Sequence, residues 1–260
     1  MLMEPYDFMV RKVVEAGEML LRARDAGFET MMKGGNPRDI VTSADNEINE
    51  FLISEIKKEF PSHRIYSEEG AGVVAGDDEQ WAIDPIDGSS NFSRDIPHYA
   101  ICMALLRGGV PQAGAVYNPM TRELFSFKKG GGAFLNGKPI HVSKETELKK
   151  SVVLLRAGRN PDSWEWGGAS YTKLLKAASK SGNYGGSALD ACYVASGRVE
   201  ANVYGNLTTM DIAGAIGILL EAGGRVVNDK GEPITFSVEP QKVVMTNNEA
   251  IETALLKLLF

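Results

Sequence analysis

The stretch WAIDPIDGSSNF, residues 81–92, is an apolar, strand-like run that leads into two carboxylates and a glycine. Pro85 fixes φ and lacks a backbone donor, so we expect strand pairing to end just after Asp84. Asp87 follows three residues later, and Gly88 permits a backbone conformation that other residues avoid. On such a rigid turn the two carboxylates and the carbonyl of Ile86 can face one point. Ligands that are all oxygen suit Mg²⁺ better than Zn²⁺.

Residues typical of a helix start follow this turn directly. Ser89, Ser90 and Asn91 can cap a short helix that must end before Pro97. Free N–H groups and the positive end of a helix dipole bind phosphate oxygens, so a helix start beside a cation predicts a phosphate site. Taken alone, the same two carboxylates are also consistent with an ordinary acidic turn.

Three further acidic residues stand at the ends of predicted buried elements. Glu68 follows the strand-like IYS, Asp45 opens a helix after DIVT, and Asp211 precedes an apolar helix. Each also has a structural explanation. Asp45 lies three residues after Thr42 and can complete a capping box, while the helix dipole favours Asp211. Glu68 can be a solvated turn charge, so only the combination with residues 84–88 favours a metal site.

The pattern of apolar residues divides the chain into two units. Helical spacing covers residues 5–24 and 43–59, with a loop at 33–37. Short β-like segments then predict an antiparallel sheet, at residues 63–69, 80–84, 99–107, 110–118 and 123–129. Strands and helices alternate afterwards: strands at 151–155, 199–204, 225–228 and 242–247, and helices at 171–180, 187–196, 211–222 and the C-terminus. The polar segment 143–150 therefore separates an α+β unit (1–145) from an α/β unit (146–260).

Composition narrows the class of protein. The chain has 260 residues, 43% of them hydrophobic, which is enough for a large buried core. It contains neither an apolar run long enough to span a membrane nor a leader-like start, so we expect a cytoplasmic protein without membrane association. A net charge of -6 argues against nucleic-acid binding. Cys102 and Cys192 lie in apolar stretches and are expected to be buried and reduced.

These segments resemble the inositol monophosphatase family, within the wider lithium-sensitive, metal-dependent phosphatase superfamily that includes fructose-1,6-bisphosphatases. The similarity runs through most of the chain in order, at DIVTSAD, SEEG, WAIDPIDGSSNF, GGAFLNGKPI, GGSALD and MDIAGAIGILLEAGG. It implies an α/β fold, a layered αβαβα sandwich with an α+β N-terminal half, and a homodimer. It also implies hydrolysis of a phosphate monoester of a small polyol or sugar.

The resemblance further assigns residue roles. The expected ligands of two or three Mg²⁺ ions are Glu68, Asp84, Asp87, Asp211 and the carbonyl of Ile86. The expected catalytic residues are Glu68 and Ser89, which would orient the attacking water, and Asp45, which would lie near one ion. The expected substrate-binding residues are Asp87, Gly88, Ser89, Ser90, Gly186, Ser187, Ala188, Tyr204 and Asp211. Lys33 is a candidate for steadying the phosphate or a third ion, or else a solvated lysine.

Three positions depart from the family pattern and leave the substrate open. Ser89 replaces a threonine, which keeps the hydroxyl, and Met210 replaces a tryptophan. Tyr204 stands where animal members place an acidic residue that contacts inositol. The leading hypothesis is hydrolysis of inositol 1-phosphate. Fructose-1,6-bisphosphatase activity, alone or as a dual activity, is the main alternative, followed by a 3′-phosphonucleotide phosphatase or a regulatory partner-binding protein.

Overall fold

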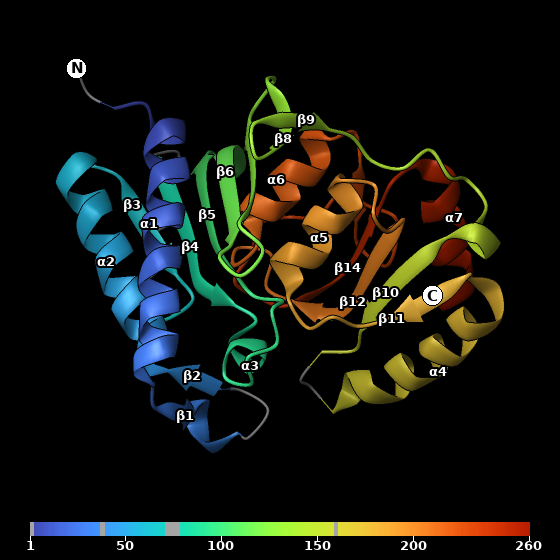
Figure 1. Cartoon of the computed structure of the whole chain (residues 1–260). Helices are drawn as coiled ribbons and strands as arrows, with labels where there is room; N and C mark the ends of the chain where they lie inside the picture. Colours follow the sequence, from blue (N-terminus) through green and yellow to red (C-terminus); the bar gives the residue numbers. More distant parts are fainter. Residues whose placement is uncertain (1–2, 37–39, 71–78, 159–160) are drawn as a thin grey trace.

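The computed structural model describes residues 3–36, 40–70, 79–158 and 161–260. Pro37 of the predicted loop and Asp39 of the DIVTSAD segment therefore lie outside the described residues. Figure 1 shows five layers: helices α1 and α2, a seven-stranded sheet, helices α5 and α6, a five-stranded sheet, and helices α4 and α7. This order confirms the expected αβαβα sandwich.

The first sheet carries the DPIDG segment. Its strands, in sheet order, are β3 (Arg64–Ser67), β4 (Gln80–Asp87), β5 (Ala100–Arg107), β6 (Val110–Asn118), β7 (Glu123–Lys128), β8 (Gly132–Leu135) and β9 (Lys138–Ile140). All neighbouring pairs are antiparallel except β3 and β4, which are parallel. The predicted antiparallel sheet is therefore correct apart from its first pair, and Lys129, Gly130 and Gly131 form the turn between β7 and β8.

Two amphipathic helices cover the outer face of this sheet. They are α1 (Pro5–Ala26), which has proline in its first turn, and α2 (Ser43–Glu59). Their apolar faces pack with Trp81, Ile83 and other side chains of the sheet into one buried cluster. Between the two helices lie β1 (Thr30–Met32), a 3₁₀ turn η1 (Lys33–Gly35) within the predicted loop 33–37, and β2 (Ile40–Thr42).

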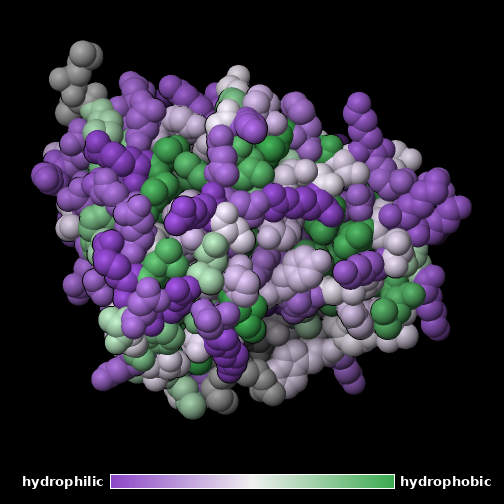
Figure 2. Space-filling model, in the orientation of Figure 1, coloured by the Kyte–Doolittle hydropathy of each residue, from purple (hydrophilic) through white to green (hydrophobic). Residues whose placement is uncertain are grey.

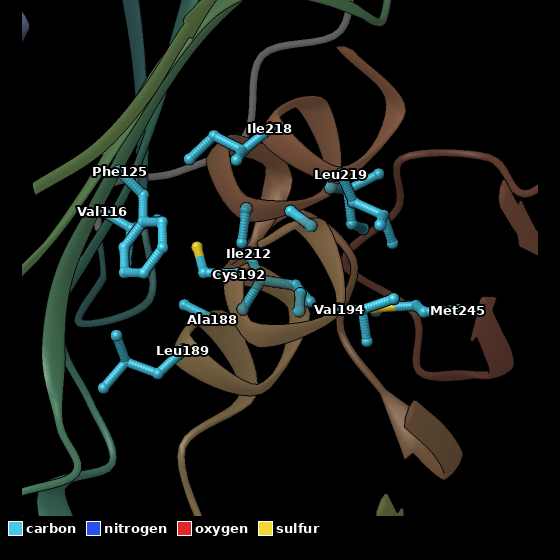
Figure 3. Close-up of a cluster of buried hydrophobic side chains, with 14 of the residues drawn as sticks. Val116, Phe125, Ala188, Leu189, Cys192, Val194, Ile212, Ile218, Leu219 and Met245 are labelled. Atoms are coloured by element: carbon cyan, nitrogen blue, oxygen red, sulfur yellow. The ribbon is translucent and has the colours of Figure 1, made fainter. Parts of the chain in front are cut away.

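The middle layer is apolar because it lies between two sheets. Helices α5 (Ser187–Ala195) and α6 (Ala213–Glu221) are buried along most of their length. Figure 3 shows Val116 and Phe125 of the first sheet pointing towards Leu189 and Cys192 of α5. A Cβ at position 217 would lie 2.1 Å from the ring of Phe127, so Gly217 lets α6 approach the first sheet closely. Both cysteines are free and buried, as expected.

The second sheet is mixed. Its order is β11 (Lys180–Gly182), β10 (Val152–Arg156), β12 (Ala201–Leu207), β14 (Gln241–Thr246) and β13 (Arg225–Val227). The first three strands run parallel, and β14 is antiparallel to both β12 and β13. Helices α4 (Asp162–Ala177) and α7 (Glu249–Leu259) cover its outer face, and a 3₁₀ turn η2 (Leu148–Lys150) precedes β10.

The surface is mainly hydrophilic in the view of Figure 2, with apolar patches between the polar side chains. Among the described residues, no helix combines the length and the apolar character that crossing a membrane requires.

Candidate active site

A β-bulge places Asp84 and Asp87 on the same side of strand β4. In the ladder with β5, Asp84 pairs with Cys102 and Asp87 with Ala100, so β4 carries one extra residue between the two pairs. Residues three apart in a regular strand point to opposite faces, and one extra residue reverses that relation. Pro85, which cannot donate to a ladder, lies within the bulge. The strand therefore continues through Pro85 to Asp87, whereas the sequence analysis expected pairing to end at Asp84.

Gly88 ends the strand and starts helix α3 (Ser89–Phe92). Its φ of 92° is in the left-handed region, and a Cβ there would lie 3.0 Å from the carbonyl oxygen of His98. Gly88 is the N-cap of α3, so the capping role expected of Ser89 is wrong. The hydroxyl of Ser89 lies instead 3.0 Å from Asp45 Oδ1 and 2.9 Å from the carbonyl oxygen of Ile86.

A cavity of about 160 Å³ opens where these elements meet. Ten of the predicted site residues line it: Glu68, Asp84, Ile86, Asp87, Gly88, Ser89, Ser90, Ser187, Tyr204 and Asp211. The other three lie one layer behind the wall, at Asp45, Gly186 and Ala188. The structure thus brings together residues from both sheets and from the loops that follow β3 and β12.

Asp45 belongs to a buried network at the start of α2. Its Oδ2 accepts from the backbone N–H of Thr42 at 2.7 Å and from the Thr42 hydroxyl at 2.6 Å, which completes a capping box. Its Oδ1 lies 3.0 Å from the Ser89 hydroxyl. The structural explanation of Asp45 is therefore confirmed, and the same carboxylate also orients Ser89.

Asp87 is held by the N-terminus of α5. Its two oxygens accept from the backbone N–H groups of Ser187 at 2.9 Å and Ala188 at 2.8 Å. The positive end of the helix dipole favours a carboxylate at this place. Ser187 and Ala188, predicted to bind substrate, thus use their N–H groups to position Asp87, and Ala188 is fully buried.

Two of the remaining carboxylates, Glu68 and Asp211, each contact a proton donor on a side chain. Lys33 Nζ of η1 lies 2.8 Å from Glu68 Oε1 and 2.7 Å from Glu69 Oε1, so Lys33 is an ion-pair partner rather than a solvated lysine. The Tyr66 hydroxyl of β3 donates to Asp211 Oδ1 at 2.6 Å. Tyr66 was not predicted, because its partner lies 145 residues away in the sequence.

The electrostatics of the cavity are those of crowded carboxylates. Burial raises the pKa of Asp84 well above its usual value, and repulsion from Glu68, Asp87 and Asp211 raises it further. Burial also raises the pKa of Asp211 to about 7, although the Tyr66 hydroxyl opposes this shift. For Asp87 burial again dominates and raises the pKa. A bound cation would remove this repulsion.

The chemistry of these donors fits a hard cation. The residues around the bulge offer carboxylate and carbonyl oxygen, the ligands that Mg²⁺ prefers. Within the part of the chain that the structure describes, no three acidic, histidine or cysteine side chains form a ready-made metal site. Glu68 is paired with Lys33 and Asp211 with Tyr66, so ion binding would exchange these partners for the cation.

The substrate side of the cavity includes Tyr204, as predicted, and one residue that was not predicted. Tyr204 borders the cavity but is 1% exposed, and its hydroxyl points to Asp190 Oδ2 at 3.4 Å. Asp190 also contacts His98 Nε2, through its Oδ1 at 2.8 Å. Arg156, which the sequence analysis did not single out, lines the same wall. Its position directly after the apolar run SVVLL was the available signal.

Comparisons with known proteins agree with this geometry. The family model described as "Inositol monophosphatase family" matches residues 2–259. Inositol monophosphatase 1 of Solanum lycopersicum is 34% identical over 239 residues, which cover 89% of this chain and 86% of the relative. Nus factor SuhB of Vibrio cholerae is 34% identical over 230 residues, or 85% and 84% of the two chains. The structure of an inositol monophosphatase from Thermotoga maritima superposes with a TM-score of 0.89 at 31% identity, covering 99% and 97%. The chain therefore belongs to the inositol monophosphatase family and is a phosphoric monoester hydrolase.

Proposed function

We propose that the cavity hydrolyses the phosphate monoester of a small polyol or sugar, with inositol 1-phosphate as the leading substrate. One observation carries this proposal. A single cavity contains four carboxylates, the hydroxyl of Ser89 and the start of α3. Inositol monophosphatases among the relatives support the choice of substrate. Fructose 1,6-bisphosphate is the main alternative, and a 3′-phosphonucleotide is a weaker one.

In this proposal each residue has a defined task. Glu68, Asp84, Asp87, Asp211 and the Ile86 carbonyl would hold two or three Mg²⁺ ions, which would supply Lewis-acid activation of water and stabilise the leaving oxygen. Glu68 and Ser89 orient the attacking water, and Asp45 keeps the Ser89 hydroxyl in place. The backbone N–H groups of Gly88 and Ser89 bind phosphate oxygens.

A pair of adjacent carboxylates provides a matched test. Glu68 lines the cavity, whereas Glu69 does not, yet both contact Lys33. We expect Glu68→Gln to lower Mg²⁺-dependent phosphate release from inositol 1-phosphate by at least about 100-fold. Glu69→Gln should retain most of the activity. Near wild-type turnover in both Glu68→Gln and Asp84→Asn would contradict the proposal, and parallel assays with the two alternative substrates rank the specificity.

A partner-binding role is the second candidate. Trp164, Tyr171 and Leu175 lie 7 and 4 residues apart on α4 and are 39%, 37% and 60% exposed. This spacing places them on one helix face, and the relative named Nus factor SuhB is consistent with a regulatory role. A partner that co-purifies in stoichiometric amount with wild type and with Asp84→Asn, but not with Leu175→Ser, would favour this role.

The homodimer that the family resemblance implies is a separate proposal. Sedimentation of the purified protein tests it.

A further inference from the structure

A buried pair, His98 and Asp190, connects two helix starts that shape the cavity. His98 lies in the segment between α3 and β5, and Asp190 lies in the first turn of α5. The two residues are 9% and 1% exposed, and His98 Nε2 lies 2.8 Å from Asp190 Oδ1, a normal hydrogen-bond distance. Neither residue lines the cavity, and neither has a task in the proposed reaction.

His98 touches both helix starts. Its backbone carbonyl accepts from the Asn91 side chain of α3 at 2.8 Å, and it lies 3.0 Å from the place of a Cβ at Gly88. Its ring lies 3.0 Å from the place of a Cβ at Gly186, which precedes α5. Both glycines therefore allow a closer approach to His98 than a side chain would permit. The start of α3 is the proposed phosphate site, and the start of α5 holds Asp87.

Asp190 extends this connection to the second sheet. Its Oδ1 contacts His98, and its Oδ2 lies 3.4 Å from the hydroxyl of Tyr204, which is in β12 and lines the cavity. Its backbone N–H donates to the carbonyl of Gly186 at 3.0 Å, which fixes the carboxylate within the first turn of α5. One carboxylate of the middle layer thus joins a segment that packs on α3 to a strand that lines the cavity.

We propose that Asp190 and His98 are positioning residues of the phosphatase reaction. Together they fix the start of α3, which carries the Ser89 hydroxyl, against the start of α5, which holds Asp87. This inference rests on the proposed function and concerns groups behind the cavity wall. A misplacement of about 1 Å can cost about 100-fold in rate, so the pair affects catalysis without touching the substrate. The competing explanation is that the pair only satisfies a buried carboxylate, in which case its loss lowers stability alone.

Two substitutions at one position separate these explanations. Asp190→Ala removes both side-chain contacts, whereas Asp190→Asn can keep them, because an amide both donates to a neutral imidazole and accepts from a hydroxyl. Well below Tm, we expect kcat/KM for inositol 1-phosphate to fall about 10- to 100-fold in Asp190→Ala but to stay within about threefold in Asp190→Asn. His98→Ala should lose as much as Asp190→Ala, and the double variant should lose no more than either single variant.

A second histidine provides the matched control. His63 is half-buried and contacts Trp81 and Glu79, and none of the three lines the active-site cavity. His63→Ala should therefore lower Tm but keep kcat/KM. If Asp190→Ala does not fold, His98→Ala and His98→Gln give the same comparison, because glutamine keeps a donor of similar reach.

The outcomes distinguish this inference from the proposed function. Wild-type kcat/KM in Asp190→Ala, an equal loss in Asp190→Asn, or additive losses in the double variant would each overturn the positioning role and leave the phosphatase proposal intact. Absence of Mg²⁺-dependent phosphate release in wild type overturns the proposed function instead. Amide hydrogen exchange tests the pair without turnover: residues 88–92 and 186–188 should exchange faster in Asp190→Ala than in wild type and His63→Ala. Equal protection of these residues in all three proteins also overturns the positioning role.

Discussion

Removal of the Ser89 hydroxyl should separate its structural contribution from its proposed chemical one. The hydroxyl lies between Asp45 Oδ1, at 3.0 Å, and the carbonyl oxygen of Ile86, at 2.9 Å. Asp45 is 1% exposed, and in a Ser89→Ala variant its Oδ2 keeps both donors from Thr42. The substitution therefore removes one hydrogen bond, the one that the Ser89 hydroxyl donates to the buried Oδ1.

The expected magnitudes differ widely for the two roles. One hydrogen bond to a buried acceptor stabilises a fold by about 1–2 kcal/mol, so Tm should fall by about 3–6 °C. At assay temperature nearly every molecule remains folded. Loss of a group that orients the attacking water should lower kcat by about 10²- to 10⁴-fold. A drop in activity of that size in Ser89→Ala cannot come from unfolding.

Thermal unfolding and phosphate release from inositol 1-phosphate, measured on the same samples, provide the assay. Ser89→Thr retains the hydroxyl and should stay within a few-fold of wild type. Ser93→Ala removes a hydroxyl that bonds the Ser90 carbonyl in the next turn, and it serves as the control. If Ser89→Ala keeps turnover within about threefold while Tm falls, the hydroxyl is purely structural and the proposed role is refuted.

Three further predictions concern the whole fold. Gly217→Ala places a Cβ 2.1 Å from the Phe127 ring and should lower stability by about 1–3 kcal/mol in urea unfolding; an unchanged midpoint would show that α6 can shift without cost. In EDTA, stability should fall as pH rises from about 5 to 8. The reason is that the pKa values of Asp211 (about 7) and Glu69 (about 8) are raised in the fold, which therefore binds more protons than the unfolded chain over that range; a midpoint that rises with pH would contradict this. Mg²⁺ should raise the Tm of wild type but not of Asp84→Asn, by calorimetry, and equal shifts in both would argue against Asp84 as a ligand.

Local sequence patterns predicted the elements whose ends are set by capping residues and whose apolar spacing is regular. The helix expected at 43–59 matches α2, because Thr42 and Asp45 cap its start and its apolar face is regular. Helix α4 begins well before the predicted residue 171, although its first turns contain Trp164, Trp166 and two glycines. Stacking of Trp166 on Phe260 at 5.4 Å stabilises that start, and this contact joins residues far apart in the sequence. Tertiary packing of this kind overrides helix propensity.

The candidate site was predictable as a set of residues but not as an arrangement. Glu68 and Asp211 lie beyond the ends of β3 and β12, and Asp87 is the last residue of β4; such positions gather at one edge of a sandwich. The bulge at Pro85 and the contact of Asp87 with α5 depend on pairing and packing between distant segments. No spacing rule encodes these contacts, and the same holds for Tyr66 and Arg156.

The arrangement of partners explains how the fold tolerates so many carboxylates in one cavity. Three of the four acidic groups are compensated, each by a different element: Glu68 by Lys33 of η1, Asp87 by the N-terminus of α5, and Asp211 by Tyr66 of β3. Among the described residues, Asp84 accepts only from the backbone N–H of Ile86, at 3.1 Å, so little opposes the burial and the carboxylate repulsion that raise its pKa. A cation placed against Asp84 would therefore relieve more repulsion than one placed at any better-compensated carboxylate. On this argument Asp84, at the bulge, is the residue around which ion binding should be strongest.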